Sequence, residues 1–574
     1  MLNNKTFLKV YLALILAVSW GVQATENTAN FFPSLRISTS LSKPSDRVNA
    51  PTFTITPEVQ PLRLRWESEP EQLAALPHRP DIPLLNPDIS PLHKIYDVAK
   101  PPAASSFSYW FTVAQYLLWV TAALFLLYTL RRYWLSRNQS SRYTSVKTKF
   151  VIAFLSAILW TVLSVYLARY WFYELSGFIG VALAALVILG IAIIPGFMNT
   201  FLVTSLLMDR RPVRVGLAEY PPLTILISAY NEEAIISKTL KSIALQHYPA
   251  PLEVMVIDDG SSDATAAIVA DEATRYSWLK LIRMPKNGGK AIALNQGLAQ
   301  ASNPLLVTLD ADSYLYADAL KSIVERYFGD PSNTKVVAGT VLVQNSRESW
   351  ITRAQEWDYF HGIAAIKRAQ SLFQGTLVAQ GAFSLYDRQT LIEVGGWPNC
   401  VGEDIVLTWA ILNRGYRVGH CEDACVFTNV PARLKQFSRQ RQRWSRGMIE
   451  AFKQHPSILF APRLSTFFIY WNILFPFLDL VFTVFFIPGL IMALFGYYWI
   501  AGPMTLALLP IAMAMNYVMF FFGKKTFTSL NLQVRTNIIG FLIYTIGYSL
   551  IMQPVCLGGY LSELFNRKKN WGTK

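Results

Sequence analysis

The sequence predicts an α/β domain with a mostly parallel sheet, inserted between two groups of transmembrane helices. Hydrophobic residues make up 52% of the 574 residues and charged residues 16%, a balance that soluble proteins rarely show. Long apolar segments lie on both sides of one polar block, residues 209–463. Inside that block, short β-rich runs alternate with helical stretches, which is typical of βαβ units.

The composition also narrows the classes of partner. The net charge of +15 favours anionic partners, such as lipid head groups or a nucleotide diphosphate. Much of the positive charge flanks apolar segments, where it sets membrane orientation, so nucleic acid is not an expected partner. With 4 cysteines in the whole chain, a disulfide scaffold is excluded as well.

The first 107 residues predict an exported segment. Residues 1–24 read as a signal peptide or an uncleaved signal anchor, because Lys5 and Lys9 precede an apolar run that ends near the small residues Val22 and Ala24. Residues 25–107 are rich in proline, which opposes both helices and central strands. We therefore expect a largely extended arm outside the cytoplasm.

Residues 108–208 predict three transmembrane helices. Their apolar segments, 108–130, 150–168 and 177–208, each approach or exceed the roughly 20 residues that span a bilayer. The linker between the first two segments carries six arginines and lysines and should be cytoplasmic. Counting crossings from the exported arm also places the polar block 209–463 in the cytoplasm, so two cues agree.

Residues 464–574 predict further transmembrane or interfacial helices and a basic tail. The apolar segments are 467–499, 503–522 and 536–561. Three crossings would leave the basic tail outside, against the positive-inside tendency. Either the segment that contains Asp479 is an interfacial helix followed by a span, or the segment that contains Pro554 is broken or re-entrant. The number of crossings stays open.

Polar residues collect where the predicted strands of the block end. In parallel sheets the carboxyl ends of strands meet at one edge, and ligands bind there. The first, second and fourth strands end in these residues: Tyr230, Asn231, Glu232, Asp258, Asp259, Asp310 and Asp312. Asp310 and Asp312 offer hard oxygen ligands to Mg²⁺ or Mn²⁺ on a diphosphate, although a solvated turn after a strand would look alike.

Two more motifs in the same region suit a nucleotide. Asp259 could accept a hydrogen bond from the imide of a uracil, with an ordinary turn as the alternative. Gly288, Gly289 and Lys290 open a helix, and a helix N-terminus with a lysine suits a phosphate. Simple helix capping explains the glycines equally well. The segment is not a Walker A loop.

Two motifs farther along offer a base and an acceptor site. Glu403 and Asp404 precede a helical run, where the helix dipole favours acidic residues in any case. A sugar hydroxyl that attacks an anomeric carbon needs a base, and Asp404 is our candidate, with Glu403 as the fallback. In the basic helical stretch 432–452, one face carries Gln440, Arg443 and Trp444. They could bind a leaving diphosphate and a sugar ring, or the stretch could lie on anionic lipid.

In this order, the motifs SAYNEE, DDGSSD, NGGKAIALN, DAD, GED and QRQRW resemble the family 2 glycosyltransferases of the processive polysaccharide-synthase type. This group includes cellulose, chitin, hyaluronan, chitooligosaccharide and poly-β-1,6-N-acetylglucosamine synthases. The resemblance covers about 222–452 and the membrane segments that follow. It implies a GT-A fold, a UDP-sugar donor and inversion at the anomeric carbon.

The resemblance also implies roles for the motif residues. Tyr230, Glu232, Asp259, Lys290 and Asp310 would bind the donor, and Asp312 with Asp310 would bind the metal. Asp404 would be the base. On the acceptor and diphosphate side it places Gln440, Arg443 and Trp444.

Two departures from the family pattern matter. Many relatives have TED where this chain has GED, so a hydroxyl beside the base is missing. No PilZ-like domain is recognisable, so direct control by cyclic diguanylate is not expected.

The expected function is processive transfer from a UDP-sugar to a growing β-linked polysaccharide at the inner membrane. UDP-GlcNAc is the first expectation for the donor and UDP-glucose the second, and accessory proteins of the cell envelope are candidate partners. A transferase that adds one sugar to a polyprenyl phosphate or glycolipid is the alternative. A transporter with a cytoplasmic binding domain is the more remote one.

Overall fold

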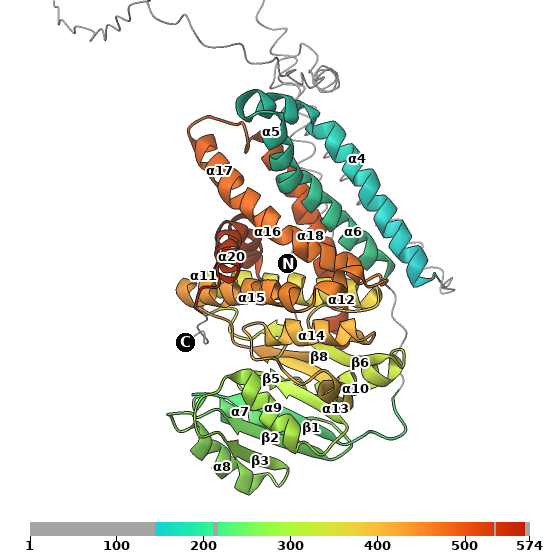
Figure 1. Ribbon diagram of the computed structural model, residues 1–574, viewed down its shortest axis with the longest axis vertical. Helices are drawn as coiled ribbons and strands as arrows, with labels where there is room; N and C mark the ends of the chain where they lie inside the picture. Colours follow the sequence, from blue (N-terminus) through green and yellow to red (C-terminus); the bar gives the residue numbers. More distant parts are fainter. Residues whose placement is uncertain (1–143, 210–215, 533–534, 569–574) are drawn as a thin grey trace, which may run out of the picture. The chain divides into compact units, whose positions relative to one another are not determined.

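The computed structural model of the protein describes residues 144–209, 216–532 and 535–568 (Figure 1). The expected signal segment, the proline-rich arm and the apolar segment 108–130 lie outside these residues. Among the described residues, two long helical segments precede the α/β region and three follow it.

An eight-stranded sheet lies at the centre of the polar block, in the order β3-β2-β1-β4-β7-β6-β8-β5. The strands are β1 (Leu223–Ala229), β2 (Leu252–Asp258), β3 (Leu279–Arg283), β4 (Leu305–Leu309), β5 (Ser313–Leu315), β6 (Thr334–Val343), β7 (Phe383–Asp387) and β8 (Arg417–Thr428). The four strands expected from the sequence are β1 to β4. The pairs β1–β2, β2–β3 and β1–β4 are all parallel. β7 runs antiparallel to β4 and to β6, so the other half of the sheet is mixed.

Helices cover both faces of the sheet, as the alternating side chains of a buried strand require. Ile225 and Ile227 of β1 pack in the same core as the helices of one face, and Leu226 in the core of the other face. The helices of the first face are α7 (Ile236–Ala244), α8 (Thr265–Arg275) and α10 (Ala319–Gly329). On the second face lie α9 (Lys290–Gln300), α13 (Arg388–Glu393) and α14 (Glu403–Asn413).

A further helical layer lies between the sheet and the apolar helices (Figure 1). It consists of α11 (Trp350–Asp358), the π-helical turn η2 (Tyr359–Ala365), α12 (Ile366–Leu372) and α15 (Leu434–Gln454). α11 begins at a capping box in which Ser349 and Thr352 satisfy each other's backbone amides. α15 matches the expected helix 432–452 to within two residues at each end.

Four helical segments of the described residues are long and apolar enough to cross a membrane: Val146–Ile179, Val181–Met208, Thr466–Leu494 and Ile538–Leu564. They comprise α4 (Val146–Ile179), α5 (Val181–Ile188), η1 (Leu189–Ile193), α6 (Ile194–Met208), α16 (Thr466–Val481), η4 (Phe482–Phe486), α17 (Ile487–Leu494), α19 (Ile538–Ile543), η5 (Tyr544–Tyr548) and α20 (Ser549–Leu564). α18 (Pro503–Ser529) contains a shorter apolar stretch, Leu509–Phe520. The chain is a membrane protein with apolar helices on both sides of its α/β domain.

The two segments that left the number of crossings open are both continuous helices. Asp479 lies inside the segment Thr466–Leu494, and Pro554 lies inside Ile538–Leu564. The helices therefore continue through both positions, and the number of crossings stays a prediction. The π-helical turns η1 and η4 each end shortly before a proline, Pro195 and Pro488, whose ring would clash with a regular preceding turn.

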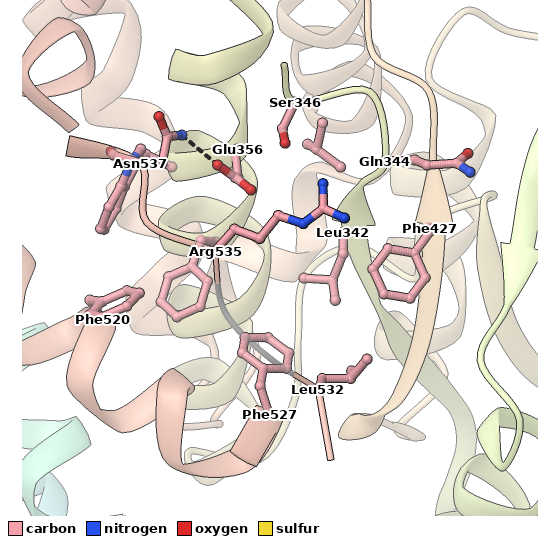
Figure 2. Close-up of a pocket in the computed structure, with 13 residues that line it drawn as sticks. Leu342, Gln344, Ser346, Glu356, Phe427, Phe520, Phe527, Leu532, Arg535 and Asn537 are labelled. Atoms are coloured by element: carbon pink, nitrogen blue, oxygen red, sulfur yellow. Dashed lines mark hydrogen bonds between the residues drawn. The ribbon is translucent and has the colours of Figure 1, made fainter. Parts of the chain in front are cut away.

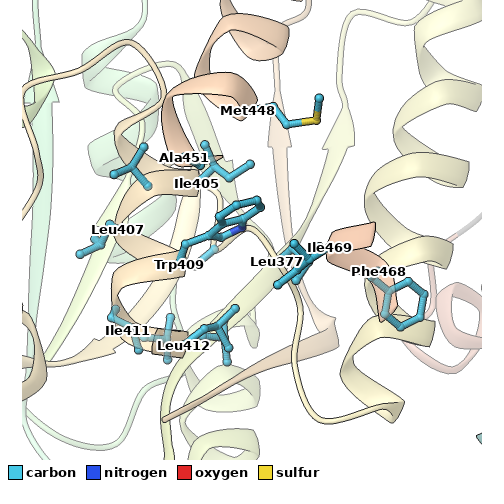
Figure 3. Packing of buried hydrophobic residues seen from close by; sticks show 14 of the residues in the cluster. Leu377, Ile405, Leu407, Trp409, Ile411, Leu412, Met448, Ala451, Phe468 and Ile469 are labelled. Atoms are coloured by element: carbon cyan, nitrogen blue, oxygen red, sulfur yellow. The ribbon is translucent and has the colours of Figure 1, made fainter. Parts of the chain in front are cut away.

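The α/β domain and the membrane segment share one hydrophobic core. Trp409 of α14 packs in the same buried cluster as Met448 of α15 and as Phe468 and Ile469 of α16 (Figure 3). This cluster extends without interruption from Leu226 in the sheet. The helices that carry the candidate base and the candidate acceptor residues are thus fixed to both parts.

Candidate active site

The loops after β1 and β2 are joined by reciprocal hydrogen bonds. The Asn231 amide donates to Ser261 Oγ, and the Ser262 amide donates to Asn231 Oδ1, both at 2.9 Å. The Glu232 amide donates to Thr265 Oγ1 at 2.8 Å. Asn231 has a φ of 57°, which an asparagine tolerates better than most residues. Strand pairing thus brings the first two motifs together, as expected, with Tyr230 half-exposed beside them.

Asp259 connects the second motif to the third. Its two carboxylate oxygens accept hydrogen bonds from the backbone amides of Gly288 and Gly289, each at 2.8 Å. The side chain is buried. Asp259 therefore holds the loop that leads into α9, and Gly289 makes the turn with a φ of 92°. This contact with the loop was not expected from the sequence.

Lys290, the first residue of α9, joins the DAD motif to the GED motif. Its Nζ forms an ion pair with Asp310 and lies 4.0 Å from Glu403 Oε1. Gly381 leaves room for it, because a Cβ at that position would lie 2.7 Å from Nζ. Burial lowers the pKa of Lys290, but the charges of Asp310 and Glu403 outweigh burial and hold the pKa above its ordinary value.

Asp310 and Asp312 form a compact pair of carboxylates. Burial, followed by the negative charges of Asp310 and Glu232, raises the pKa of Asp312 to about 7, and the charge of Lys290 opposes this shift. Thr428 Oγ1 donates to Asp312 Oδ1 at 3.4 Å. Such repulsion between neighbouring carboxylates is what a bound cation relieves.

The donor set fits a divalent cation that also binds a ligand. Within 144–209, 216–532 and 535–568 the structure shows no group of three or more His, Cys, Asp or Glu side chains that could hold a metal ion. Asp310 and Asp312 would therefore supply part of an octahedral shell. Mg²⁺ and Mn²⁺ commonly complete such a shell with water and phosphate oxygens.

The two carboxylates of the GED motif have different environments. Glu403 is buried, and burial followed by the charge of Asp404 raises its pKa to about 7. Asp404 is only half-buried, and its Oδ1 accepts a hydrogen bond from the Ile405 amide at 2.8 Å. The difference in exposure thus distinguishes Asp404 from Glu403, which helical periodicity alone does not do.

Lys367 is a nearby residue that sequence reasoning missed. It is buried in α12, and its Nζ donates to the Val378 carbonyl at 2.8 Å. Burial lowers the pKa of Lys367 to about 7, opposed by the charge of Asp404. A lysine in an ordinary helical run carries no motif that would have marked it.

α15 presents its expected residues to two parts of the site. The charge of Arg443 acts on Glu403 and lowers the pKa of that carboxyl, opposing burial. The ring of Trp444 lies 6.2 Å from that of Tyr359, and the charges of Asp312 and Asp310 reach Tyr359 in turn. Trp444 itself is 41% exposed, so part of its side chain is accessible to a ligand.

The guanidinium group of Arg441 stacks on the Trp444 ring. The sequence motifs did not mark this arginine. Its guanidinium carbon lies 4.2 Å from the centroid of the Trp444 ring. Its Nη2 forms an ion pair with Asp358 Oδ2 at 2.7 Å. Asp358 comes from α11, so no local pattern could have revealed the pair.

Most of the expected site residues converge through these contacts. Contacts or charges at short range link this set: Glu232, Asp259, Lys290, Asp310, Asp312, Glu403, Asp404, Arg443 and Trp444. Tyr230 and Gln440 have no such link within the described part of the chain. The Gln440 side chain keeps a buried Oε1 that finds no hydrogen-bond partner there.

A separate cavity of about 410 Å³ lies beside the sheet and contains none of the expected site residues (Figure 2). Its walls come from β6, β8, α11, α18 and the segment that follows α18. Aromatic side chains dominate one side, and Arg535 extends across the cavity toward Ser346 and Leu342 (Figure 2). Asn537 donates to Glu356 at its edge.

Comparisons with known proteins find similarity to the same family that the sequence motifs resemble. Residues 224–395 match the model of glycosyl transferase family 2. The chain is 32% identical over 241 residues to a poly-beta-1,6-N-acetyl-D-glucosamine synthase of Staphylococcus aureus (strain COL), covering 42% of this chain and 57% of that protein. A protein with the same name from Staphylococcus epidermidis (strain ATCC 35984) is 32% identical over 226 residues, covering 39% of this chain and 54% of that protein.

The chain thus spans a little more than half the length of these curated relatives. Among solved structures it is similar to a mannosyltransferase of Pyrobaculum calidifontis in complex with GDP-Man and Mn²⁺. That likeness has a TM-score of 0.46 at 21% identity and covers 67% of this chain and 99% of the other.

Proposed function

We propose, from the match of residues 224–395 to the model of glycosyl transferase family 2, that the protein is an inverting, processive polysaccharide synthase with a GT-A fold. The proposed donor is a UDP-sugar, with UDP-GlcNAc first and UDP-glucose second. The acceptor is a growing β-linked polysaccharide. One observation carries the proposal: Lys290 contacts Asp310 on one side and approaches Glu403 on the other, so the DAD and GED motifs meet at the same lysine.

On the donor side, the uridine would bind between the loop after β2 and the loop before α9, which Asp259 connects. Asp310 and Asp312 would hold Mg²⁺ or Mn²⁺, which when bound neutralises charge on the diphosphate. Lys290 lies at the start of α9, where its ammonium and the helix N-terminus can both face phosphate oxygens. Tyr230 and Glu232 border the same edge of the sheet.

On the acceptor side, Asp404 takes the proton of the attacking sugar hydroxyl. Its carboxylate is the more accessible of the pair, whereas Glu403 is buried against Lys290. Arg443 can stabilise the departing diphosphate, and Trp444 offers a flat surface to the terminal sugar. Gln440 lies one helical turn before both, on the same face of α15.

The apolar helices on both sides of the domain support a location at the inner membrane with the domain in the cytoplasm. In this arrangement the product would leave through or beside the protein's own helices, and envelope accessory proteins would meet it on the far side. The basic linkers noted in the sequence support the same orientation.

The test is synthesis by purified full-length protein in lipid nanodiscs. It would be incubated with a panel of UDP-sugars and either Mg²⁺ or Mn²⁺, and the products weighed by mass spectrometry. We expect long polymers from UDP-GlcNAc, and loss of at least about 100-fold in turnover for Asp404→Asn. Glu403→Gln, its neighbour, serves as the matched comparison and should lose less.

Product length separates the alternatives. If the product is a lipid that carries one sugar, the protein is a single-addition transferase and not a processive synthase. Movement of a solute without consumption of UDP-sugar would favour a transporter. Normal polymer synthesis by Asp404→Asn would refute the assignment of the base.

A further inference from the structure

The turn that carries the candidate base touches α15 through two glycines. Gly402 precedes α14, and Gly447 lies within α15. A Cβ built on Gly447 would lie 2.6 Å from Cα of Gly402 and 3.2 Å from its nitrogen. No real Cβ tolerates the first distance, so any larger residue at 447 must push the two backbones apart. Gly402 has a φ of −106°, so close approach and not backbone strain explains this glycine.

Glu450 binds the same turn. Its Oε2 accepts a hydrogen bond from the Gly402 amide at 2.9 Å, and its side chain is buried, with 2% exposure. Gly402 is the residue before the first turn of α14 and has no side chain that could cap that turn. The Glu450 carboxylate of α15 thus accepts a hydrogen bond from the backbone amide at the start of α14.

Both contacts lie on the face of α15 that carries Arg443. Residues 443, 447 and 450 are spaced i, i+4 and i+7, so they follow one stripe along the helix. Beside this stripe, Met448 and Ala451 pack with Ile405 and Trp409 of α14 (Figure 3). The packing leaves little freedom for the two helices to slide.

We infer that Gly447 and Glu450 are positioning residues that set the distance between the base Asp404 and the acceptor-side residues Arg443 and Trp444. The inference rests on the proposed function and deepens it. Gly447 permits backbone contact, and Glu450 fixes the register of that contact through the Gly402 amide. Glycine therefore stands before the acidic pair of GED for a physical reason: a threonine there would meet the backbone of Gly447.

The test compares Gly447→Ala with a matched glycine substitution in full-length protein in nanodiscs. We expect Gly447→Ala to lower kcat for UDP-GlcNAc about 100-fold, since a displacement of about 1 Å has an effect of that size. The KM for the donor should stay unchanged, because the donor loops around Asp259 are not touched. Gly329→Ala is the control: it lies in α10, where an added Cβ meets nothing within 4 Å, and should behave as wild type.

Glu450 supplies a second, independent arm. Glu450→Gln keeps an oxygen that can accept from the Gly402 amide and should retain most of kcat. Glu450→Leu has no acceptor and should lose kcat as Gly447→Ala does. Binding of UDP, measured by calorimetry on every variant, shows whether the donor site is folded.

Three results would overturn the inference. They are a wild-type kcat in Gly447→Ala, equal effects of Glu450→Gln and Glu450→Leu, or loss of UDP binding in step with kcat. Absence of turnover by the wild-type protein with every UDP-sugar is a different outcome, because it would refute the proposed function itself.

Discussion

At the scale of single residues, the site is a set of acidic groups whose charges are compensated from several directions. Lys290 stands between Asp310 and Glu403, Arg443 acts on Glu403, and the Asp259 carboxylate is satisfied by two backbone amides. Glu403 is nevertheless destabilised in its charged form, since burial and Asp404 raise its pKa to about 7. A glutamate in this state titrates near neutral pH.

This shift predicts a pH dependence of stability. The pKa of Glu403 is higher in the folded protein than in the unfolded chain. The carboxyl group of Glu403 therefore stays protonated up to a higher pH in the folded protein. Glu403 therefore costs almost no stability at pH 4, an increasing amount as the pH rises from about 4.5 to about 7, and a constant amount above that. We expect Glu403→Gln to raise Tm relative to wild type at pH 8 and to have little effect at pH 5.

Differential scanning fluorimetry between pH 5 and pH 8.5 would measure this difference. Glu219→Gln, at an exposed position, is the control and should leave Tm unchanged across the range. A Tm difference between Glu403→Gln and wild type that does not grow with pH would contradict the assignment of the raised pKa.

Sequence reasoning found the residues whose chemistry is local and missed those whose role depends on a distant partner. Asp310 and Lys290 were expected because a carboxylate after a buried strand and a lysine at a helix start are informative by themselves. Arg441 and Glu450 were not, because their partners, Asp358 and Gly402, lie far away in the chain. The sequence offers no physical reason to prefer Asp404 over Glu403, and the greater exposure of Asp404 supplies one.

At the scale of elements, α15 is the helix on which the site depends most. Beyond its contact with α14, it is tied to α20 by a buried ion pair: Arg446 Nη2 lies 3.2 Å from Glu563 Oε2 and donates to the Arg567 carbonyl at 2.8 Å. Lys453 Nζ lies 3.2 Å from the other oxygen of Glu563. A second tie runs through Asp358, which accepts from Tyr548 of η5 at 3.0 Å and pairs with Arg441.

We expect removal of one partner of the buried pair to destabilise the attachment of α20. Glu563→Ala would leave Arg446 buried without its counter-charge, at a cost of about 3 kcal/mol. Thermal unfolding in detergent should show a lower Tm. The double variant Arg446→Met, Glu563→Met removes both charges and should recover part of the loss. Strictly additive effects of the two changes would argue against a direct pair.

The elements themselves were predictable in one half of the domain. From β1 to β4, apolar runs alternate with amphipathic helices in a regular order, and the structure follows it. In the other half, β7 inserts antiparallel between β4 and β6. That pairing joins segments distant in sequence, so periodicity within any one segment does not specify it.

At the scale of the whole molecule, the apolar segments were expected from their length and composition, and the structure confirms helices there for the described residues. Their number of crossings was not settled, because a proline or a buried acid in an apolar run is compatible with a break or with a continuous helix. The continuous helices around Asp479 and Pro554 depend on neighbours: Tyr560 of α20 donates to Asp479 at 3.1 Å.

The proposed orientation can be tested by labelling with a membrane-impermeant maleimide. Lys286→Cys lies in the loop before α9, and Tyr497→Cys lies beyond the far end of the span Thr466–Leu494. We expect Tyr497→Cys to react in right-side-out vesicles and Lys286→Cys only in inverted ones. The native cysteines are buried or half-buried, so the unsubstituted protein gives the background. The reverse pattern would place the domain outside the cytoplasm.

The core shared by the sheet, α14, α15 and α16 has a consequence for handling the protein. A chain cut before α16 would lose Phe468, Ile469 and Trp471, and the apolar surface they cover around Trp409 and Met448 would face water. Such a fragment would aggregate instead of remaining soluble. Crystallisation or drug screening therefore calls for the intact chain in a lipid mimetic.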